Sequence, residues 1–552
     1  MRQGVDTFIV RIMSSSQYGH PTLSTGDRTE NATLNGDISI SEKNKEIKAK
    51  NERFDGRDLE AATTGVVAVD DTAPGGMSEM ERKQIEAGNP NIVDWEPNDP
   101  GNPLNWSSSR KWFNMGTVGL MCFVSPFAST LPAPALPTIA HNFRITNSSV
   151  AALCISIFIL AYAFGPLVAS PASELYGRAP VYKAFFVIFF LFNIGSALAK
   201  NTTQFILCRF FAGIGGSAAI TVAAGVDLFR SEQRGAAMST VSLGPLLAPI
   251  IAPVIGGFMA ERLNVSWSLW LLSILSGLVM IFSFVFVHET NPEVLLRRRV
   301  HRMRHETGNE KLISIYDVKH GEKTAREVFF INMSRAIVLF FTDPSCMMIG
   351  IYMAIVYGYL YLLFVTFGYI FTLNYGQSTE IAGLHYIAPG IGQLLGAAFA
   401  SIAMDKIFIT LKKRHNGEGR PEFRVPLMFI ASILMPAGLF IYGWCGKYHT
   451  HWIALDIGVM IFGFGTIVCF LALNTYLLDA FTYAASAVAA TTVIRSIAGA
   501  LFPLFGQAMF DKLGLGWGNS LLAFIALVLG TVYPIFLWYY GPAIRASGKS
   551  ER

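Results

Sequence analysis

Charged residues and cysteines are both scarce in this sequence. Only 15% of its 552 residues are charged, whereas 52% are hydrophobic and the mean hydropathy is +0.42. This balance is too apolar for an ordinary globular enzyme. The six cysteines are scattered, with no CxxC pair and no metal-ligand spacing. We therefore expect buried free thiols rather than disulfides or a metal site.

Nucleotide-binding and catalytic motifs are also missing. No loop of the form G-x-x-x-x-G-K-[ST] occurs, which excludes an ATP-driven pump. The segment Gly213-Ile-Gly215-Gly216 faintly resembles a dinucleotide fingerprint, but it lies in an apolar run with no soluble strand before it, so helix packing explains it better. Histidines and carboxylates do not cluster as in a membrane enzyme. We expect no enzymatic activity, no cofactor and no nucleic-acid partner.

Long apolar runs make up most of the chain after Phe113. Each is roughly twenty residues long, enough to cross about 30 Å of hydrocarbon. Twelve such runs predict twelve transmembrane helices, near 113–134, 150–170, 181–199, 204–225, 237–259, 267–287, 345–371, 382–403, 425–445, 452–476, 485–508 and 519–540.

Basic residues mark one side of the predicted membrane protein. The loop from His288 to Thr342 divides the runs six and six and carries five arginines between Arg297 and Arg304, which places it in the cytosol by the positive-inside rule. Both termini are then cytosolic. The residues from Ser14 to Pro103 are polar and form no core, and the mildly apolar stretch from Met1 to Met13 lacks a signal-peptide pattern. The expected organisation is a disordered cytosolic tail (1–105), a six-helix bundle (106–287), a cytosolic loop (288–343), a second six-helix bundle (344–541) and a cytosolic tail (542–552).

The two predicted bundles resemble each other in sequence. An offset of 250 residues aligns Pro253 with Pro503, and Trp267 with Trp517. The charged pair Glu261-Arg262 then meets Asp511-Lys512. Parallel repeats of this kind are a transporter architecture, with the substrate site at the interface of the repeats.

The fifth predicted helix carries an unusual stripe of small residues. Prolines inside a helix remove backbone hydrogen bonds, which a membrane helix tolerates when its neighbours approach closely. Such a kinked helix suits a bundle that changes shape. The small residues recur every fourth position, each followed by a proline or glycine, at Gly244-Pro245, Ala248-Pro249, Ala252-Pro253 and Gly256-Gly257.

Several segments together resemble the fungal branch of twelve-helix drug:proton antiporters of the major facilitator superfamily. They are the fifth-helix stripe, with alanines where two glycines are usual, and the segments Ser170–Pro180, Ile206–Gly216, Asn102–Trp106 and Tyr357–Tyr361. The resemblance implies an all-α membrane protein of two pseudo-symmetric six-helix bundles. It implies export of small amphipathic drugs, toxins or secondary metabolites by proton antiport. A polyamine or other cation exporter and an inward nutrient porter remain alternatives, since fold does not fix function.

The same resemblance implies the partners and the setting of the protein. We expect a monomer in the lipid bilayer of the plasma membrane, with protons and a small molecule as its ligands. The proton gradient would be its energy source.

Charged residues in or beside the spans are candidates for proton coupling and gating. Arg209 lies about one turn into the fourth predicted helix and Arg495 about midway along the eleventh. A charge deep in the bilayer normally faces a partner or a wet cavity. We expect Arg209 to hold a carboxylate or a water chain. Glu174, Arg178 and Asp227 should meet at the cytosolic surface, where the family implies a latch, and Asp479 suggests a second, weaker one.

No carboxylate lies convincingly at mid-membrane, so the proton carrier stays unassigned at this point. His385 titrates in a useful pH range, but a single histidine near a helix start is more often a satisfied polar residue. The expected substrate cavity is aromatic and uncharged, which suits bulky amphipathic molecules, whereas polyamines would require carboxylates. Its expected lining is Tyr357, Tyr361, Phe364, Asn474 and Tyr476.

Overall fold

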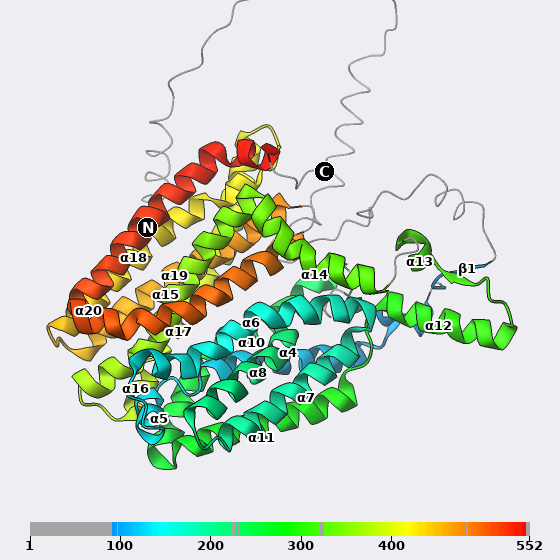
Figure 1. Cartoon of the computed structure of the whole chain (residues 1–552). Coiled ribbons are helices and arrows are strands. Elements are labelled where there is room, and N and C mark those ends of the chain that lie inside the picture. Colours follow the sequence, from blue (N-terminus) through cyan, green and yellow to red (C-terminus); the bar gives the residue numbers. More distant parts are fainter. Residues whose placement is uncertain are drawn as a thin grey trace, which may run out of the picture. The chain divides into compact units, whose positions relative to one another are not determined.

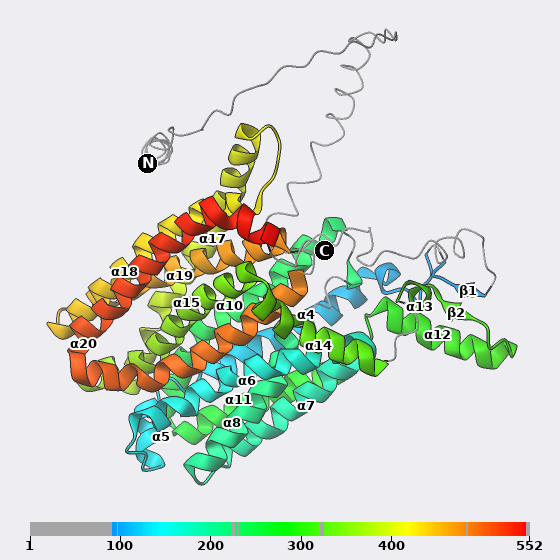
Figure 2. The same cartoon turned by 45° about the horizontal axis from the view of Figure 1, so that its top comes forward.

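The computed structural model describes residues 91–96, 98–221, 227–229, 231–320, 325–481 and 484–547. Nearly all regular structure in these residues is helical, as expected. Figures 1 and 2 show two groups of long helices, one from each half of the chain. The N-terminal half contains α4 (Ser108–Thr130), α5 (Leu136–Asn142), α6 (Ser148–Leu175), α7 (Arg178–Ala197), α8 (Thr202–Thr221), α10 (Ser231–Arg262) and α11 (Val265–Phe286). The C-terminal half contains α15 (Pro344–Tyr369), η3 (Ile370–Asn374), α16 (Thr379–Leu384), α17 (Ile387–Arg414), η4 (Pro421–Arg424), α18 (Pro426–Lys447), α19 (Trp452–Ala480) and α20 (Ala484–Ser547).

Within the described residues, nine helices are long and apolar enough to cross a membrane. Helices α4 and α8 occupy the places of the first and fourth predicted spans. Helix α20 covers the last two predicted spans and bends at Gly514, whose φ of 73° interrupts the helical backbone. The arrangement agrees with the expected fold, and the count of twelve spans stays a prediction.

Polar side chains define where several of these helices begin. The side chain of Asn147 accepts a hydrogen bond from the Ser149 amide at the start of α6. Asn264 does the same for α11 and Asp343 for α15. Such caps satisfy backbone N–H groups that have no partner within the helix. These three helices therefore begin where a cap precedes an apolar run.

Large apolar side chains cover the outside of the helix groups. On α11, Trp267 is 53% exposed and Ile274 is 56% exposed, and Phe284 is similarly open. A soluble protein rarely exposes such a continuous apolar surface. This surface is suited to contact with lipid.

The two ends of the helix groups differ. We call the end that carries α5 and α16 the α5 end, and the opposite end, beside α12 (Pro292–Thr307), the α12 end (Figure 1). The halves contact each other at the α5 end, where the Ser149 hydroxyl donates to the Leu504 carbonyl at 2.7 Å. Contacts between α6 and α20 and between α10 and α16 belong to the same interface.

The segment between the two halves is largely helical in the described residues. It contains α12, β2 (Ile313–Ser314), α13 (Ile315–His320) and α14 (Ala325–Thr342). Strand β1 (Ile92–Val93) pairs in parallel with β2. The expectation of an unstructured tail up to residue 105 is therefore wrong for its last part. Backbone pairing and the contact of Asp99 with Arg299 order it against α12, and the first 90 residues lie outside the described chain.

Candidate functional site

The small-residue stripe of α10 packs against α4, inside the N-terminal half. Ala248 and Ala252 are fully buried. A methyl group added to Gly244 would lie 3.0 Å from the Phe123 amide nitrogen, and one added to Gly256 would collide with the Leu131 carbonyl oxygen. The helix stays continuous through Pro245, Pro249 and Pro253. The stripe therefore joins two helices of the same half.

The residues beside the stripe form a different contact, which joins the two halves. A methyl group at Gly257 would lie 2.7 Å from the Thr379 carbonyl oxygen of α16, and one at Gly383 would lie 2.7 Å from the Pro253 carbonyl oxygen. Arg262 forms an ion pair with Glu380 at 2.7 Å. We call this α10–α16 contact at the α5 end the outer closure.

Arg209 lies fully buried on α8. Its guanidinium donates to the carbonyl of Ala128 at 2.7 Å and to that of Ser129 at 3.3 Å, and lies 4.6 Å from the ring centre of Phe158. Its Nε has no acceptor among the described residues. Among the described residues no carboxylate contacts Arg209, which instead binds two carbonyls near the end of α4. The other expected partner, a water chain, stays a prediction. Arg209 positions the chain just before Leu131, which α10 contacts.

Arg495, on α20, lies between two aromatic rings. Its guanidinium carbon is 4.6 Å from the ring centre of Tyr357 on α15 and 5.0 Å from that of Phe470 on α19. Cations are attracted to the faces of aromatic rings. Its Nε also has no acceptor in the described part of the chain. Arg495 is therefore a cation held by stacking rather than by an acid.

Tyrosines connect the surroundings of the two arginines. The rings of Tyr357 and Tyr361 lie 4.9 Å apart, and Tyr361 interacts with the hydroxyl of Ser129. Tyr361 also packs edge-on against Phe364. Three of the predicted cavity residues thus form one aromatic group at the interface of the halves. We call Tyr357, Tyr361, Phe364, Phe470 and Arg495 the central aromatic group.

The other two predicted cavity residues are placed differently. Asn474 lies one helical turn after Phe470 and donates to its carbonyl at 3.1 Å, so it borders the central aromatic group. Tyr476 is fully buried within the C-terminal half, and its hydroxyl lies 3.4 Å from the Glu422 carboxylate. The structure does not bring Tyr476 to the central aromatic group, because two residues along a helix turn the side chain to another face.

The predicted charge cluster at the α12 end is present in the N-terminal half. Arg178 donates to Asp227 at 3.1 Å and to the Ser173 hydroxyl at 2.7 Å, and Glu174 contributes to its electrostatic surroundings. Burial raises the pKa of the Asp227 carboxyl, and the neighbouring Arg178 opposes that shift. Glu289 completes the cluster.

Glu289 accepts hydrogen bonds from the first amides of α7, at Arg178 and Ala179. Gly177 makes this approach possible: its φ is +104°, and a methyl group there would collide with the Glu289 carboxylate. The glycine is required at this turn both for its backbone conformation and for space.

A corresponding cluster holds the α12 end of the C-terminal half. Arg424 donates to Asp479 at 2.9 Å and lies 3.5 Å from Asp405. Beside it, Arg545 donates to the buried Glu422 at 2.7 Å. Asp479 was predicted as a second, weaker latch, and its partner Arg424 is the last residue of η4, just before α18. Each half therefore joins its helices at this end through an arginine and an aspartate.

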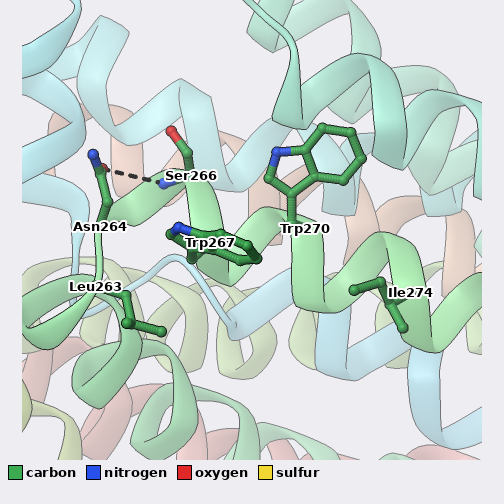
Figure 3. Close-up of a pocket in the computed structure, with 6 residues that line it drawn as sticks. All are labelled: Leu263, Asn264, Ser266, Trp267, Trp270 and Ile274. Atoms are coloured by element: carbon green, nitrogen blue, oxygen red, sulfur yellow. Dashed lines mark hydrogen bonds between the residues drawn. The ribbon is translucent and has the colours of Figure 1, made fainter.

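A shallow depression also lies on the outside of the N-terminal half. Figure 3 shows its lining at the start of α11, with Trp267 and Trp270 flanking it and Asn264 capping the helix. The depression faces outward, and none of its lining side chains is charged. Its tryptophans suit the membrane–water interface.

Sequence reasoning missed several of these residues. Glu289 contacts Arg178 from 111 positions away in the chain, and Arg545 reaches Glu422 across 123. No local motif connects such residues. Among the described residues, no group of three or more metal-ligating side chains occurs.

Comparisons with known proteins agree with this architecture. The Major Facilitator Superfamily profile matches residues 118–503. The efflux pump radE of Floropilus chiversii is 41% identical over 487 residues, covering 87% of this chain and 90% of that protein. The efflux pump vrtL of Penicillium aethiopicum is 41% identical over 464 residues, covering 83% and 91%.

Solved structures show the same fold. The crystal structure of a D-xylose–proton symporter superposes with a TM-score of 0.58 at 16% identity, covering 78% of this chain and 97% of that one. A partially occluded inward-open structure of the xylose transporter XylE from E. coli gives 0.56 at 17% identity, covering 78% and 98%. The chain therefore belongs to the major facilitator superfamily, and it is a multi-pass membrane transporter rather than an enzyme.

Proposed function

We propose that this transporter exports small amphipathic organic molecules by proton antiport with alternating access. The observation that carries the proposal is the outer closure, in which Gly257 and Pro253 of α10 contact α16 of the other half. These contacts join the two halves and hold no helices together within either half. They can therefore separate while each half stays folded. The relatives named as efflux pumps support the export direction.

The central aromatic group supports a substrate class. Its rings supply area for stacking, and Arg495 supplies a permanent positive charge with no acid partner among the described residues. Arg209 adds a second cation nearby on the N-terminal side. Such surroundings favour neutral or anionic aromatic molecules and disfavour polycations, because like charges repel in a low-dielectric site. A polyamine exporter is therefore the weaker candidate.

Coupling between the central group and the outer closure follows from Arg209 in this proposal. It holds the carbonyls of Ala128 and Ser129, and the next turn places Leu131 against Gly256 of α10. A shift of α4 would thus be transmitted to α10. The charge clusters of Arg178 and Arg424 would keep each half rigid while the halves move.

The setting of the proposed exporter is the plasma membrane, with the arginine-rich α12 end and both termini in the cytosol. We propose that it works as a monomer, with no cofactor and with the proton gradient as its energy source. The α5 end would then face outward, so the described conformation is closed toward the outside.

Transport by purified protein in sealed vesicles tests the proposal. A fluorescent amphipathic anion should accumulate against its gradient when a pH gradient is imposed, and an uncoupler should abolish the accumulation. A dicationic dye serves as the control and should be transported poorly. Accumulation that ignores the uncoupler would contradict proton coupling, and movement in the same direction as protons would favour an inward porter.

A further inference from the structure

A buried histidine–aspartate pair lies at the α5 end of the C-terminal half. His385 follows α16 directly and is 6% exposed. Its Nδ1 lies 2.8 Å from the Asp456 carboxylate on α19, and its Nε2 lies 2.8 Å from Oε1 of Gln377. The ring stacks on Phe371 with centres 3.7 Å apart. The imidazole is therefore held in one plane between two acceptors.

Two acceptors on one imidazole favour its protonated form. A neutral imidazole carries one N–H, whereas an imidazolium carries two and can donate to both neighbours. The carboxylate of Asp456 supplies the compensating charge that a buried cation requires. If the ring lost the proton on Nε2, that nitrogen would face the lone pair of Gln377 Oε1. The contact would be restored only by a rotation of the Gln377 amide that brings its NH₂ group to the ring. The site thus has two hydrogen-bonding arrangements that differ by one proton.

Other titratable groups surround the pair without replacing it. Tyr442 of α18 interacts electrostatically with Asp456, and also with Tyr386 and Tyr375. The hydroxyl of Tyr386 donates to the Phe364 carbonyl, and that of Tyr375 to Thr450. The tyrosines stay protonated at neutral pH. Two further histidines lie on the loop before α19: His449 contacts Tyr375, and His451 contacts Trp452. Among the described residues, Asp456 is the carboxylate that His385 contacts.

The pair is connected to the outer closure through α16. Gly383, two residues before His385, packs on Pro253 of α10. Glu380, on the same short helix, pairs with Arg262 of the other half. A change in the bonds of His385 would therefore shift the short helix that closes the α5 end. No other described His–acid pair adjoins a contact between the halves.

We propose that His385 and Asp456 bind the coupling proton and that its binding stabilises the outer closure. The inference rests on the proposed proton antiport. A proton arriving from the α5 side would add to the imidazole, forming the second N–H, and the closed end would then be favoured. Its loss toward the other side would free the closure to open. Histidine suits this role because its ring can bind one further proton and then donates a hydrogen bond from each nitrogen.

The test compares His385→Gln and Asp456→Asn with wild type in reconstituted vesicles. His141→Gln is the matched control, because His141 is an exposed histidine at the α5 end of the other half. Two transport modes are measured: accumulation driven by a pH gradient, and substrate–substrate exchange at equal pH on both sides. We expect both variants to lose gradient-driven accumulation by about tenfold or more and to keep exchange. The control should match wild type in both modes.

A milder variant covers the case in which the first two fail to fold. Gln377→Leu removes one acceptor of the imidazolium and leaves Asp456 in place, so the pH midpoint of gradient-driven transport should move to lower pH by about half a unit or more. Full gradient-driven accumulation in His385→Gln and Asp456→Asn, or an unmoved midpoint in Gln377→Leu, would overturn the inference alone. A wild-type protein indifferent to the pH gradient would overturn the proposed antiport with it.

Discussion

The two halves hold their central arginines in different ways. Arg209 of the N-terminal half is fully buried and donates to two carbonyls of α4. Arg495 of the C-terminal half is half-buried between the rings of Tyr357 and Phe470. A guanidinium that fills its fork with backbone acceptors fixes a helix, whereas one held by stacking keeps donors available to a ligand. The first arginine thus positions structure, and in the proposed function the second is the one that contacts substrate.

The α5 ends of the two halves also differ, one being apolar and the other carrying a titratable pair. In the N-terminal half this end is closed by apolar packing, for example of Phe143 on Phe205 at 5.6 Å. In the C-terminal half it contains the His385–Asp456 pair. In the proposed mechanism the two bundles therefore have different roles: the N-terminal half is the fixed scaffold, and the C-terminal half carries the groups that respond to a proton or a ligand.

The largest expected effect comes from filling the contact between the halves. Gly257→Leu should reduce export below detection while the protein still inserts, because the added side chain meets α16 and prevents the outer closure. Gly256→Leu should also stop export, but with lower abundance, since it strains packing against α4 inside one half. Overpacking of this kind costs about 1–3 kcal/mol or more. Export is measured in whole cells and abundance by quantitative blotting.

Gly116→Leu is the control for that pair, because no atom lies within 4 Å of the added position on α4. Normal export by Gly257→Leu at wild-type abundance would mean that the α10–α16 contact does not close the transporter.

The charge clusters provide the next comparison. Arg424→Ala leaves both Asp405 and Asp479 without their cation, and should lower the free energy of unfolding by about 2–3 kcal/mol, somewhat less than for a fully buried pair. Adding Asp405→Asn and Asp479→Asn should restore most of the loss. Thermal unfolding of the detergent-solubilised protein measures both. Equal stability of the single and triple variants would show that the cluster does not hold this half together.

The central arginines provide a third, smaller comparison. Arg495→Gln should raise the KM for an anionic substrate by about tenfold, which corresponds to about 1.4 kcal/mol, with little change in stability. Arg209→Lys keeps the charge but loses the planar fork that reaches two carbonyls, so it should lower kcat and stability together. Initial rates and thermal unfolding separate the two patterns. Identical behaviour of both variants would remove the distinction between a positioning and a binding arginine.

The smallest effect is expected at the ordered end of the tail. Burial alone would raise the pKa of Asp99, but the Gly101 amide and Arg299 together hold that pKa below its ordinary value. The carboxylate therefore stabilises the docked segment above about pH 4, and the contribution is lost as the pH falls through the lowered pKa. Asp99→Asn should cost at most about 1 kcal/mol because Arg299 is partly exposed.

Hydrogen exchange of residues 91–105 at pH 7 measures the effect of Asp99→Asn. Faster exchange than in wild type is expected, with Asp94→Asn, an exposed acid on the same segment, as the control. Unchanged exchange would assign the docking to β1–β2 pairing alone.

Local patterns in the sequence were sufficient for part of this account. The fifth-helix stripe and the meeting of Arg178 with Asp227 followed from spacing and from short loops. The partners of Arg209 could not be predicted, because carbonyl acceptors leave no signature in a sequence. His385 and Asp456 are 71 positions apart, so only the packing of α17 against α19 brings them together. Tyr476 was misplaced because it lies two positions after Asn474, so the two side chains point to different faces of α19.

The central claim is that substrate and protons cross the membrane in opposite directions, through one transporter that opens to each side in turn. Simultaneous recording of both fluxes in reconstituted vesicles tests it most directly, with a fluorescent amphipathic anion outside and a pH-sensitive dye inside. When substrate is added to right-side-out or to inside-out vesicles, protons should move in the direction opposite to the substrate in both preparations. Gly257→Leu should abolish both fluxes. Substrate movement without proton movement, or movement of both in the same direction, would contradict the claim.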